Sequence, residues 1–239
     1  MKLLDLTLAT PPDNLSLDEA LLESADERGE PSEVLRLWES PTPIIVVGRS
    51  SQVNVEVHRS ACEQDGVPIF RRSSGGAAIV AGPGCLMYAV VLSYEIRPEL
   101  QVITNAHEFV LGRIAAAIRN LGCTVEHQGT SDLTSNGKKI SGNSMRCKRN
   151  HLLYHGTLLY NFDLTHVSRY LGTPPRQPDY RIGRDHERFV NNLSVNVNEL
   201  RDAIIESWNA HENVSNWPLK LTKRLAQEKY TQHDWNFRR

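Results

Sequence analysis

One loop of the chain combines two arginines, two serines and four glycines, and it lies between two apolar segments. The loop spans residues 71–84. The flanking segments 67–70 and 86–92 are apolar and rich in β-branched residues, so both are predicted to be strands. Glycines let backbone N–H groups converge on an anionic oxygen, and arginines add forked donors. The loop therefore predicts an anion-binding site or, in the simpler interpretation, a glycine hairpin with surface arginines.

Short strands and helices alternate along the rest of the chain. Apolar residues at helical spacing predict helices over 13–25, 58–65, 104–121, 164–171, 197–208 and 218–230. Apolar runs predict strands over 34–38, 44–48, 123–126 and 152–162, and Asn136-Gly137 predicts the turn of a hairpin over 133–142. Because strands outnumber helices in the middle of the chain, we expect an α+β fold with a mixed, mainly antiparallel central sheet flanked by helices.

The polar segment 172–190 contains four arginines and three prolines. Such a segment is typical of an exposed, mobile arm, and we favour this interpretation over a dedicated partner-binding segment.

The charge balance excludes a strongly basic or acidic protein. Lys and Arg number 27 against 28 Asp and Glu, which gives a formal net charge of −1 over 239 residues. No global field favours nucleic acid or an anionic membrane, so neither is expected as a partner. The N-terminal residues do not read as a signal peptide, and no apolar run approaches the ~18 residues of a membrane span. We expect a cytoplasmic protein with one domain over 1–239, because no linker or repeat interrupts the chain.

The four cysteines, at positions 62, 85, 123 and 147, lie more than 20 residues apart. This spacing fits neither a zinc site nor a compact disulfide framework, so we expect mostly buried, inert thiols. Cys147 is the exception, because Arg146, Lys148 and Arg149 are the kind of neighbours that activate a thiol.

Two further polar clusters follow the loop. Asp132 and Lys139 lie at opposite ends of a predicted hairpin arm, and Ser141-Gly142 follows directly. A lysine beside a flexible Gly/Ser turn can contact a carboxylate and a phosphate at once. His155-Gly156-Thr157 is a polar break in an apolar strand, and its glycine indicates a bulge or a close approach of another backbone. The simpler interpretations are solvated lysines and a buried, hydrogen-bonded histidine.

Taken in order, these motifs resemble those of the lipoate protein ligases in the biotin and lipoate protein ligase superfamily. The resemblance covers nearly the whole chain and rests on several modest motifs. These are Asn-Leu-Ser-Leu-Asp-Glu-Ala at 14–20, Val-Gly-Arg at 47–49, Arg-Arg-Ser-Ser-Gly-Gly at 71–76, Gly-Thr-Ser-Asp-Leu at 129–133, Lys-Ile-Ser-Gly-Asn-Ser at 139–144, His-Gly-Thr-Leu-Leu at 155–159 and Trp-Asn-Phe at 235–237.

The resemblance implies a catalytic domain like those of class II aminoacyl-tRNA synthetases and biotin ligases, with an apolar tunnel for lipoate. It also implies ATP and Mg2+, a lipoyl-AMP intermediate and transfer to a lysine of a lipoyl-acceptor protein domain. The implied catalytic residue is Lys139. The implied nucleotide-binding residues are Asp132, Lys139, Ser141 and Gly142. Asp132 would also lie beside Mg2+. The implied substrate-binding residues are Arg49, Arg71, Arg72, Ser74, Gly75, Gly76, Ala77, His155, Gly156 and Thr157.

The chain departs from the family pattern in the second half of the loop. Ala77, Ala81, Gly82 and Cys85 stand where such ligases usually have a third glycine, a His-Asp pair and an asparagine. The accessory C-terminal domain of many such ligases is also not expected here. Either a separate accessory subunit supplies it or the enzyme works without it.

Other functions remain open beside ATP-dependent lipoate ligation. Related octanoyl and lipoyl transferases use a cysteine thiolate and no ATP, although no cysteine here matches their positions. Biotin ligation is favoured only by Gly82-Pro83-Gly84, which resembles a segment of the biotin ligases. A non-catalytic protein that binds acyl groups or carrier domains is the remaining alternative.

Overall fold

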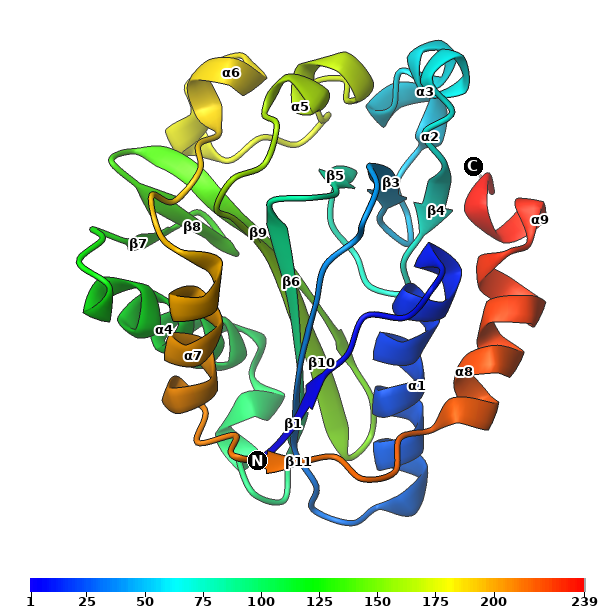
Figure 1. Ribbon diagram of the computed structural model, residues 1–239, viewed down its shortest axis with the longest axis vertical. Helices are drawn as coiled ribbons and strands as arrows, with labels where there is room; N and C mark the ends of the chain where they lie inside the picture. The colour runs from blue at the N-terminus through cyan, green and yellow to red at the C-terminus, as the bar shows by residue number, and fades with distance from the viewer. Residues whose placement is uncertain (239) are drawn as a thin grey trace.

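An eight-stranded mixed sheet forms the centre of the computed structural model, which describes residues 1–238 (Figure 1). Its middle strands, β6 (Cys85–Ser93) and β10 (His151–Leu159), pair antiparallel over nine residues. The spatial order is β11-β1-β2-β6-β10-β9-β8-β7. The other strands of this sheet are β1 (Lys2–Asp5), β2 (Val34–Trp38), β7 (Glu126–Gln128), β8 (Asp132–Ser135), β9 (Lys138–Cys147) and β11 (Glu212–Asn213). Within the large sheet, as far as residues 1–238 describe it, β1 pairs parallel with β11 and β2 and every other pair is antiparallel, so the expected mainly antiparallel sheet is confirmed.

A smaller sheet holds β3 (Ile44–Val47) between β4 (Ile69–Arg71) and β5 (Ile79–Ala81). β3 pairs parallel with β4 and antiparallel with β5. The predicted strands 34–38 and 44–48 are both present, but they belong to different sheets. We did not predict β5, because three residues are too few to show an alternating pattern. Strands of the small sheet therefore anchor both ends of the glycine-rich loop.

Helices cover both faces of the large sheet. α4 (Ile103–Asn120) and α7 (Val197–Ser207) pack on one face, while α1 (Pro11–Arg28) packs on the other with α8 (Leu219–Leu225) beside it (Figure 1). The shorter helices are α2 (Val53–Glu56), α3 (Arg59–Asp65), α5 (Thr165–Tyr170), α6 (His186–Phe189) and α9 (His233–Asn236). The helix predicted over 218–230 comprises α8 and a π-helical turn, Ala226–Tyr230. None of the helices within residues 1–238 is long and apolar enough to cross a membrane.

Two element boundaries differ from prediction for local reasons. α1 begins two residues earlier than expected, because Thr10 caps it by accepting a hydrogen bond from the Asp13 backbone N–H. The strand predicted over 123–126 begins only at Glu126. Arg119 of α4 donates to the Val125 carbonyl at 2.9 Å, so this backbone oxygen bonds a side chain instead of a neighbouring strand.

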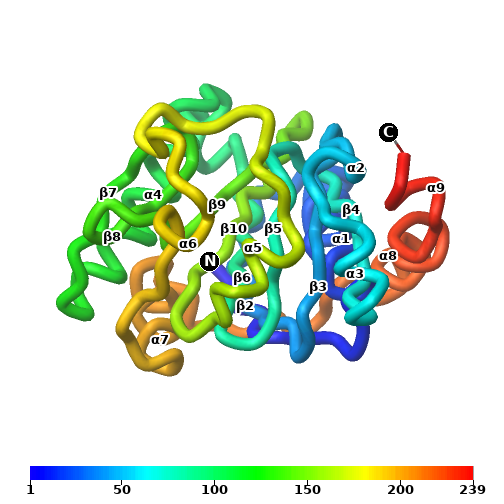
Figure 2. Tube along the Cα trace, turned by 90° about the horizontal axis from the view of Figure 1, so that it is seen from above, coloured from blue at the N-terminus to red at the C-terminus, as the bar shows by residue number. Residues whose placement is uncertain are grey.

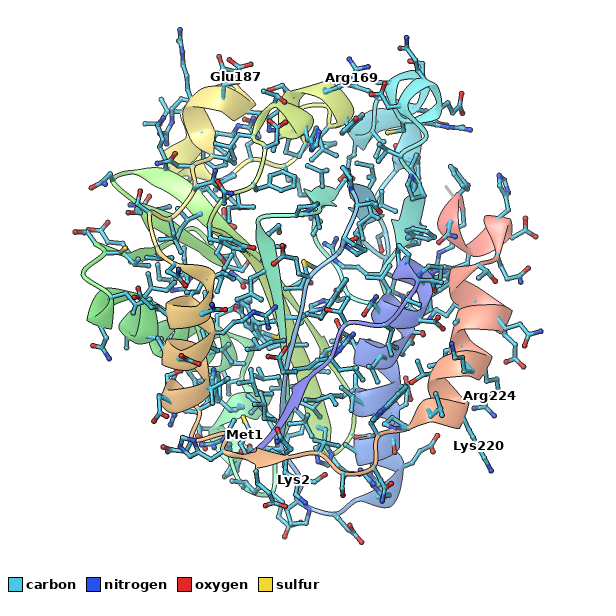
Figure 3. The ribbon with its side chains drawn as sticks, in the orientation of Figure 1. Met1, Lys2, Arg169, Glu187, Lys220 and Arg224 are labelled. Carbon is cyan, nitrogen blue, oxygen red and sulfur yellow. The ribbon has the colours of Figure 1, made fainter. Side chains whose placement is uncertain are left out.

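The segment 172–190 packs against the protein on one side, whereas we expected an exposed arm. Its outward side chains, such as Glu187, are exposed and point away from the protein (Figure 3). Its inward side chains pack: the Tyr180 hydroxyl donates to Asp132 at 2.7 Å, and Arg184 donates to the Gly137 carbonyl at 2.9 Å. In Figure 2 the segment, in yellow, crosses the end of the large sheet near β9, with which it forms the bridge between Lys139 and Val190. We call 172–190 the arm below.

Arg71 joins the small sheet to the C-terminal segment. Its side chain is fully buried, and its guanidinium donates to backbone carbonyls from two distant parts of the chain. These belong to Gly48 at 2.6 Å, Arg49 at 3.4 Å, Ser51 at 2.9 Å, Arg238 at 2.8 Å, Trp235 at 3.0 Å and Asn236 at 3.1 Å. Arg71 therefore holds the C-terminal segment against the segment that follows β3.

Replacing Arg71 by methionine is expected to lower the free energy of unfolding by about 2–4 kcal/mol, because buried carbonyls lose charged donors. Urea unfolding followed by circular dichroism measures this. Arg59→Met is the control, since the Arg59 guanidinium also contacts the C-terminal segment, over the Phe237 ring at 5.1 Å, but the side chain is 43% exposed. Equal losses in both variants would contradict the role assigned to Arg71.

Candidate functional site

The loop after β4 wraps around the guanidinium of Arg72. Arg72 donates to the carbonyls of Val46, Gly75 and Ala77, each at 3.0 Å. Gly76 has φ +87°, and a Cβ there would lie 2.8 Å from Arg72 Nη2, so the close approach requires glycine. Burial lowers the pKa of Arg72 to about 10, which still leaves it charged at neutral pH. Arg72 thus shapes the loop from inside.

The arginines do not all face a ligand as we expected. Arg72 lines a cavity, but Arg71 directs its donors into the protein, so we correct its expected anion-binding role to a structural one. Arg49 contributes its backbone N–H to the Ser74 carbonyl at 2.8 Å, while its side chain is exposed. The partners of the Arg71 guanidinium lie on distant segments of the chain, so the sequence motif could not predict them.

Two cavities lie beside the loop and share part of their lining. The inner lobe, about 180 Å³, is lined by Leu15 of α1, Val46 of β3, Met87 of β6, Asp18 and Arg72, among others. The arm lobe, about 120 Å³, lies under the arm and is lined mainly by apolar side chains. The residues that line both lobes are Ala77, Ala78, Ile79, Lys139, Gly142 and Thr157. Ser141 lines the arm lobe only, and His155, Gly156 and Gly76 line the inner lobe only.

A third and wider space, the open groove, adjoins the two lobes. It has a volume of about 910 Å³. Its lining comes from 50–52, 130–132, 143–145 and 174–178, together with Glu56, Gly76, Ala77 and His107. Asp132 lines both this groove and the inner lobe, so the groove reaches the Lys139 region from outside.

The hairpin β8–β9 brings Asp132 and Lys139 together. Its turn is the predicted Asn136-Gly137 pair, with φ values of +50° and +71°. Lys139 Nζ lies 2.7 Å from Asp132 Oδ1, and the Tyr180 hydroxyl from the arm donates to the other Asp132 oxygen. A Cβ on Gly142 would lie 3.0 Å from Lys139 Nζ, so this glycine gives the lysine room to lie across the strand. The ammonium is held at the boundary between the two lobes.

A buried chain of hydrogen-bonded polar groups runs beside the inner lobe, and two of its members, His155 and Asp18, line that lobe. Ser74 Oγ lies 2.6 Å from His155 Nε2, and His155 Nδ1 lies 3.5 Å from Asp18 Oδ2. The other Asp18 oxygen accepts from Arg36 Nη1 at 2.5 Å. Because a carboxylate only accepts, Nδ1 of His155 donates to it, and Nε2 shares a hydrogen bond with the Ser74 hydroxyl. The chain fixes the orientation of His155 and of the loop above it.

Asp18 and Arg36 were missed in the sequence, although Asp18 lies in one of the motifs. Both are at least nine-tenths buried. Burial, the largest single effect, opposes ionisation of Asp18, but Arg36 and His155 together outweigh it and hold the pKa of Asp18 below its usual range. A charged residue inside an apolar helix pattern was the available signal for Asp18.

Gly156 is a point of close approach, although the nearest atom belongs to a side chain and not to the backbone that we expected. A Cβ there would lie 1.7 Å from Asn143 Oδ1 on β9. The same oxygen accepts from the Tyr88 hydroxyl at 2.5 Å, and Asn143 donates to the Ser131 carbonyl at 2.8 Å. Asn143 is thereby locked at the edge of the inner lobe.

Neither a metal cage nor a reactive thiol is evident among residues 1–238. No group of three or more His, Cys, Asp or Glu side chains is placed to hold a metal ion. Asp132 is a single carboxylate whose two oxygens contact Lys139 and Tyr180. No cysteine lines the three cavities described; burial raises the pKa of Cys85 to about 12, and Cys147 is exposed.

Comparison with known proteins gives consistent matches. The family model described as "Lipoyl protein ligase A/B catalytic domain" matches residues 10–209. A probable lipoate-protein ligase A of Mycoplasma pneumoniae is 30% identical over 234 residues, which cover 94% of this chain and 67% of that protein. Octanoyltransferase LipM of Geobacillus kaustophilus is 24% identical over 275 aligned positions, covering 100% of this chain and 98% of that protein.

Solved structures share the fold. A lipoate-protein ligase A bound with ATP superposes with a TM-score of 0.85 at 23% identity, covering 99% of this chain and 98% of that one. The bi-partite lipoate protein ligase of Thermoplasma acidophilum, described with its E2 lipoyl domain, superposes with a TM-score of 0.84 at 22% identity, covering 99% and 95%.

Proposed function

Because the chain belongs to the lipoyl protein ligase A/B catalytic-domain family, we propose that it is an ATP-dependent lipoate protein ligase. In this proposal it activates lipoate as lipoyl-AMP and transfers the lipoyl group to a lysine of a lipoyl-acceptor domain. The observation that carries the proposal is that one lysine, Lys139, lines both the inner lobe and the arm lobe. A ligase of this kind must hold a carboxylate and the α-phosphate of ATP against each other, and Lys139 lines both lobes.

The polar groups of the two lobes decide which substrate each one takes. The inner lobe is apolar at Leu15, Val46 and Met87, and its buried polar side chains all have hydrogen-bond partners within residues 1–238. An acyl chain offers no hydrogen bonds, so it fits a lobe that needs none. The arm lobe then receives the nucleotide, with the phosphates toward Lys139.

The reaction divides into two balanced steps. A carboxylate oxygen of lipoate attacks the α-phosphorus of ATP, the bond between the α-phosphorus and its bridging oxygen breaks, and pyrophosphate leaves. The neutral amine of an acceptor lysine then attacks the acyl carbon, AMP leaves and the amine loses a proton. The Lys139 ammonium offsets the negative charge that gathers on the phosphate and carboxylate oxygens, and the loop 74–77 fixes the carboxylate end.

Mg2+ fits this site only with help from the nucleotide. Mg2+ usually binds one or two carboxylates together with substrate phosphates, and Asp132 supplies one carboxylate. To do so, Asp132 must release Lys139 or Tyr180. Bound there, the ion would neutralise phosphate charge.

The open groove gives the acceptor lysine a route to the centre. It extends from solvent to Asp132, next to the ion-paired Lys139. We propose that a lipoyl-acceptor domain docks over this groove. The bi-partite ligase of Thermoplasma acidophilum supports a further proposal, that residues 1–239 form a catalytic domain that acts with a separate accessory subunit.

A second candidate, cysteine-dependent octanoyl transfer, is favoured by the match to octanoyltransferase LipM. That match spans 98% of the relative, whereas the lipoate-protein ligase of Mycoplasma pneumoniae is matched over 67% of its length. An acyl-enzyme needs a thiolate beside the acyl group, and no cysteine lines the lobes among residues 1–238. The cavity lining therefore favours the ligase.

Intact-mass analysis of an apo acceptor domain separates these functions. The domain is incubated with the protein, ATP, Mg2+ and lipoate, octanoate or biotin in parallel, and with octanoyl carrier protein without ATP. We expect a lipoyl mass gain that requires ATP. An octanoyl gain without ATP that Cys147→Ala abolishes would establish the transferase instead, and lipoate binding without pyrophosphate release would indicate a non-catalytic binding protein.

A further inference from the structure

One buried hydrogen-bond donor of the arm lobe has no partner. Arg181 lies on the arm and is 3% exposed. Its Nε donates to the Arg184 carbonyl at 2.8 Å, and its guanidinium lies 4.7 Å from the centre of the Phe189 ring. Within residues 1–238, Nη2 of Arg181 is buried and makes no hydrogen bond, although the side chain lines the arm lobe. The arm thus holds an unsatisfied donor on a side chain that lines the cavity.

A buried donor without a partner is costly, so such a group indicates an acceptor that arrives with a ligand. The hydrocarbon and dithiolane parts of lipoate carry no strong acceptor, and its carboxylate is already assigned to Lys139 and the loop 74–77. On the proposed function, the acceptor therefore belongs to the nucleotide.

The surroundings of Arg181 favour a neutral acceptor over a phosphate. Phe162, Phe189 and Val190 make this lobe largely apolar. Within residues 1–238 its one lining carboxylate, Glu56, accepts the Ala78 backbone N–H at 2.7 Å. A multiply charged phosphate needs several donors and would be repelled by Glu56. One ring nitrogen needs one donor, which is what Nη2 provides.

We propose that Arg181 is a specificity-determining residue, whose Nη2 donates to a ring nitrogen of the adenine base in the arm lobe. This inference rests on the proposed function and adds the group that distinguishes the base. The flat aromatic and aliphatic walls hold the faces of the ring, and the arm carries the donor to its edge.

Binding of ATP and of tripolyphosphate, each with Mg2+ and measured by isothermal titration calorimetry, tests the inference. Arg181→Met is expected to weaken ATP binding by about 10- to 100-fold, because a charge-assisted hydrogen bond is lost. Tripolyphosphate has no base, so its affinity is expected to change less than about twofold. Arg188→Met is the matched control, since Arg188 lies on the same arm with its side chain 81% exposed, and it is expected to change neither affinity.

Three outcomes would overturn the inference and leave the ligase function intact. These are unchanged ATP affinity in Arg181→Met, an equal loss for ATP and tripolyphosphate, and an equal loss in Arg188→Met. Failure of the parent protein to bind ATP at all would instead reject the proposed function.

The parent protein gives a second readout that does not depend on folding of the variant. ATP analogues with carbon in place of N1, N3 or N7 each remove one ring acceptor. We expect one of the three to bind about 10-fold or more weakly than ATP. Equal affinity for all three would exclude a ring nitrogen as the partner of Arg181.

Discussion

Replacing Lys139 by alanine is expected to reduce ATP-dependent lipoyl transfer by about 10²–10³-fold, the effect of removing one preorganised charged donor from a transition state. The lysine ammonium lies at the junction of the two lobes, paired with Asp132 Oδ1 at 2.7 Å. No other lysine lines either lobe among residues 1–238. Its loss leaves the charge of the carboxylate and α-phosphate without that ammonium. Pyrophosphate release and acceptor mass, followed over time, measure the two steps.

Lys138→Ala is the matched control for this prediction. Lys138 precedes Lys139 on β9, and neighbouring residues of a strand point to opposite faces of the sheet. Lys138 lines none of the three cavities, so its removal is expected to change the rate less than about twofold. If Lys139→Ala transferred lipoate as fast as the parent protein, the assigned mechanism would be wrong.

The parts of the site that were predictable from sequence have local determinants. Asn136-Gly137 specifies a tight hairpin turn, and this turn sets the pairing of β8 with β9. Asp132, Lys139 and Gly142 follow from that hairpin alone. The close approach at Gly156 was likewise indicated by one glycine in an apolar strand.

The parts that were not predictable depend on contacts between distant segments. From the sequence we expected Arg71 to donate hydrogen bonds to a bound anion. Its partners instead include carbonyls of the C-terminal segment, 164 residues or more along the chain. The arm looked mobile, because its proline and arginine content hides that Tyr180 and Arg181 face inward. The buried pair of Asp18 and Arg36 joins α1 to β2. Because the two residues belong to different elements, their spacing in the sequence does not predict that they pair.

Replacing Asp18 by asparagine is expected to lower the free energy of unfolding by about 3–5 kcal/mol, because the buried Arg36 charge loses its counter-ion. Arg36 is fully buried, and its other hydrogen bonds are to uncharged oxygens of Leu6 and Asn14, so the Asp18 carboxylate at 2.5 Å is the counter-ion of the guanidinium. Asp5→Asn is the control, since Asp5 pairs with Arg201 at 2.7 Å in a partly exposed position. Exposed pairs contribute less than about 1 kcal/mol. A loss as small as that of the control would show that Asp18 does not stabilise Arg36.

The same pair also determines how stability depends on pH. The pKa of Asp18 is lower in the folded protein than its value of about 4 in an unfolded chain. A group with a lowered folded pKa stabilises the protein above its unfolded pKa, and this stabilisation is lost as the pH falls toward the folded value. Urea unfolding from pH 8 to pH 3 should therefore show a constant difference between parent and Asp18→Asn down to about pH 5, which shrinks below about pH 4. A difference that grows on acidification would mean that Asp18 is protonated in the native state, and the buried chain to His155 would then lack the carboxylate that orients it.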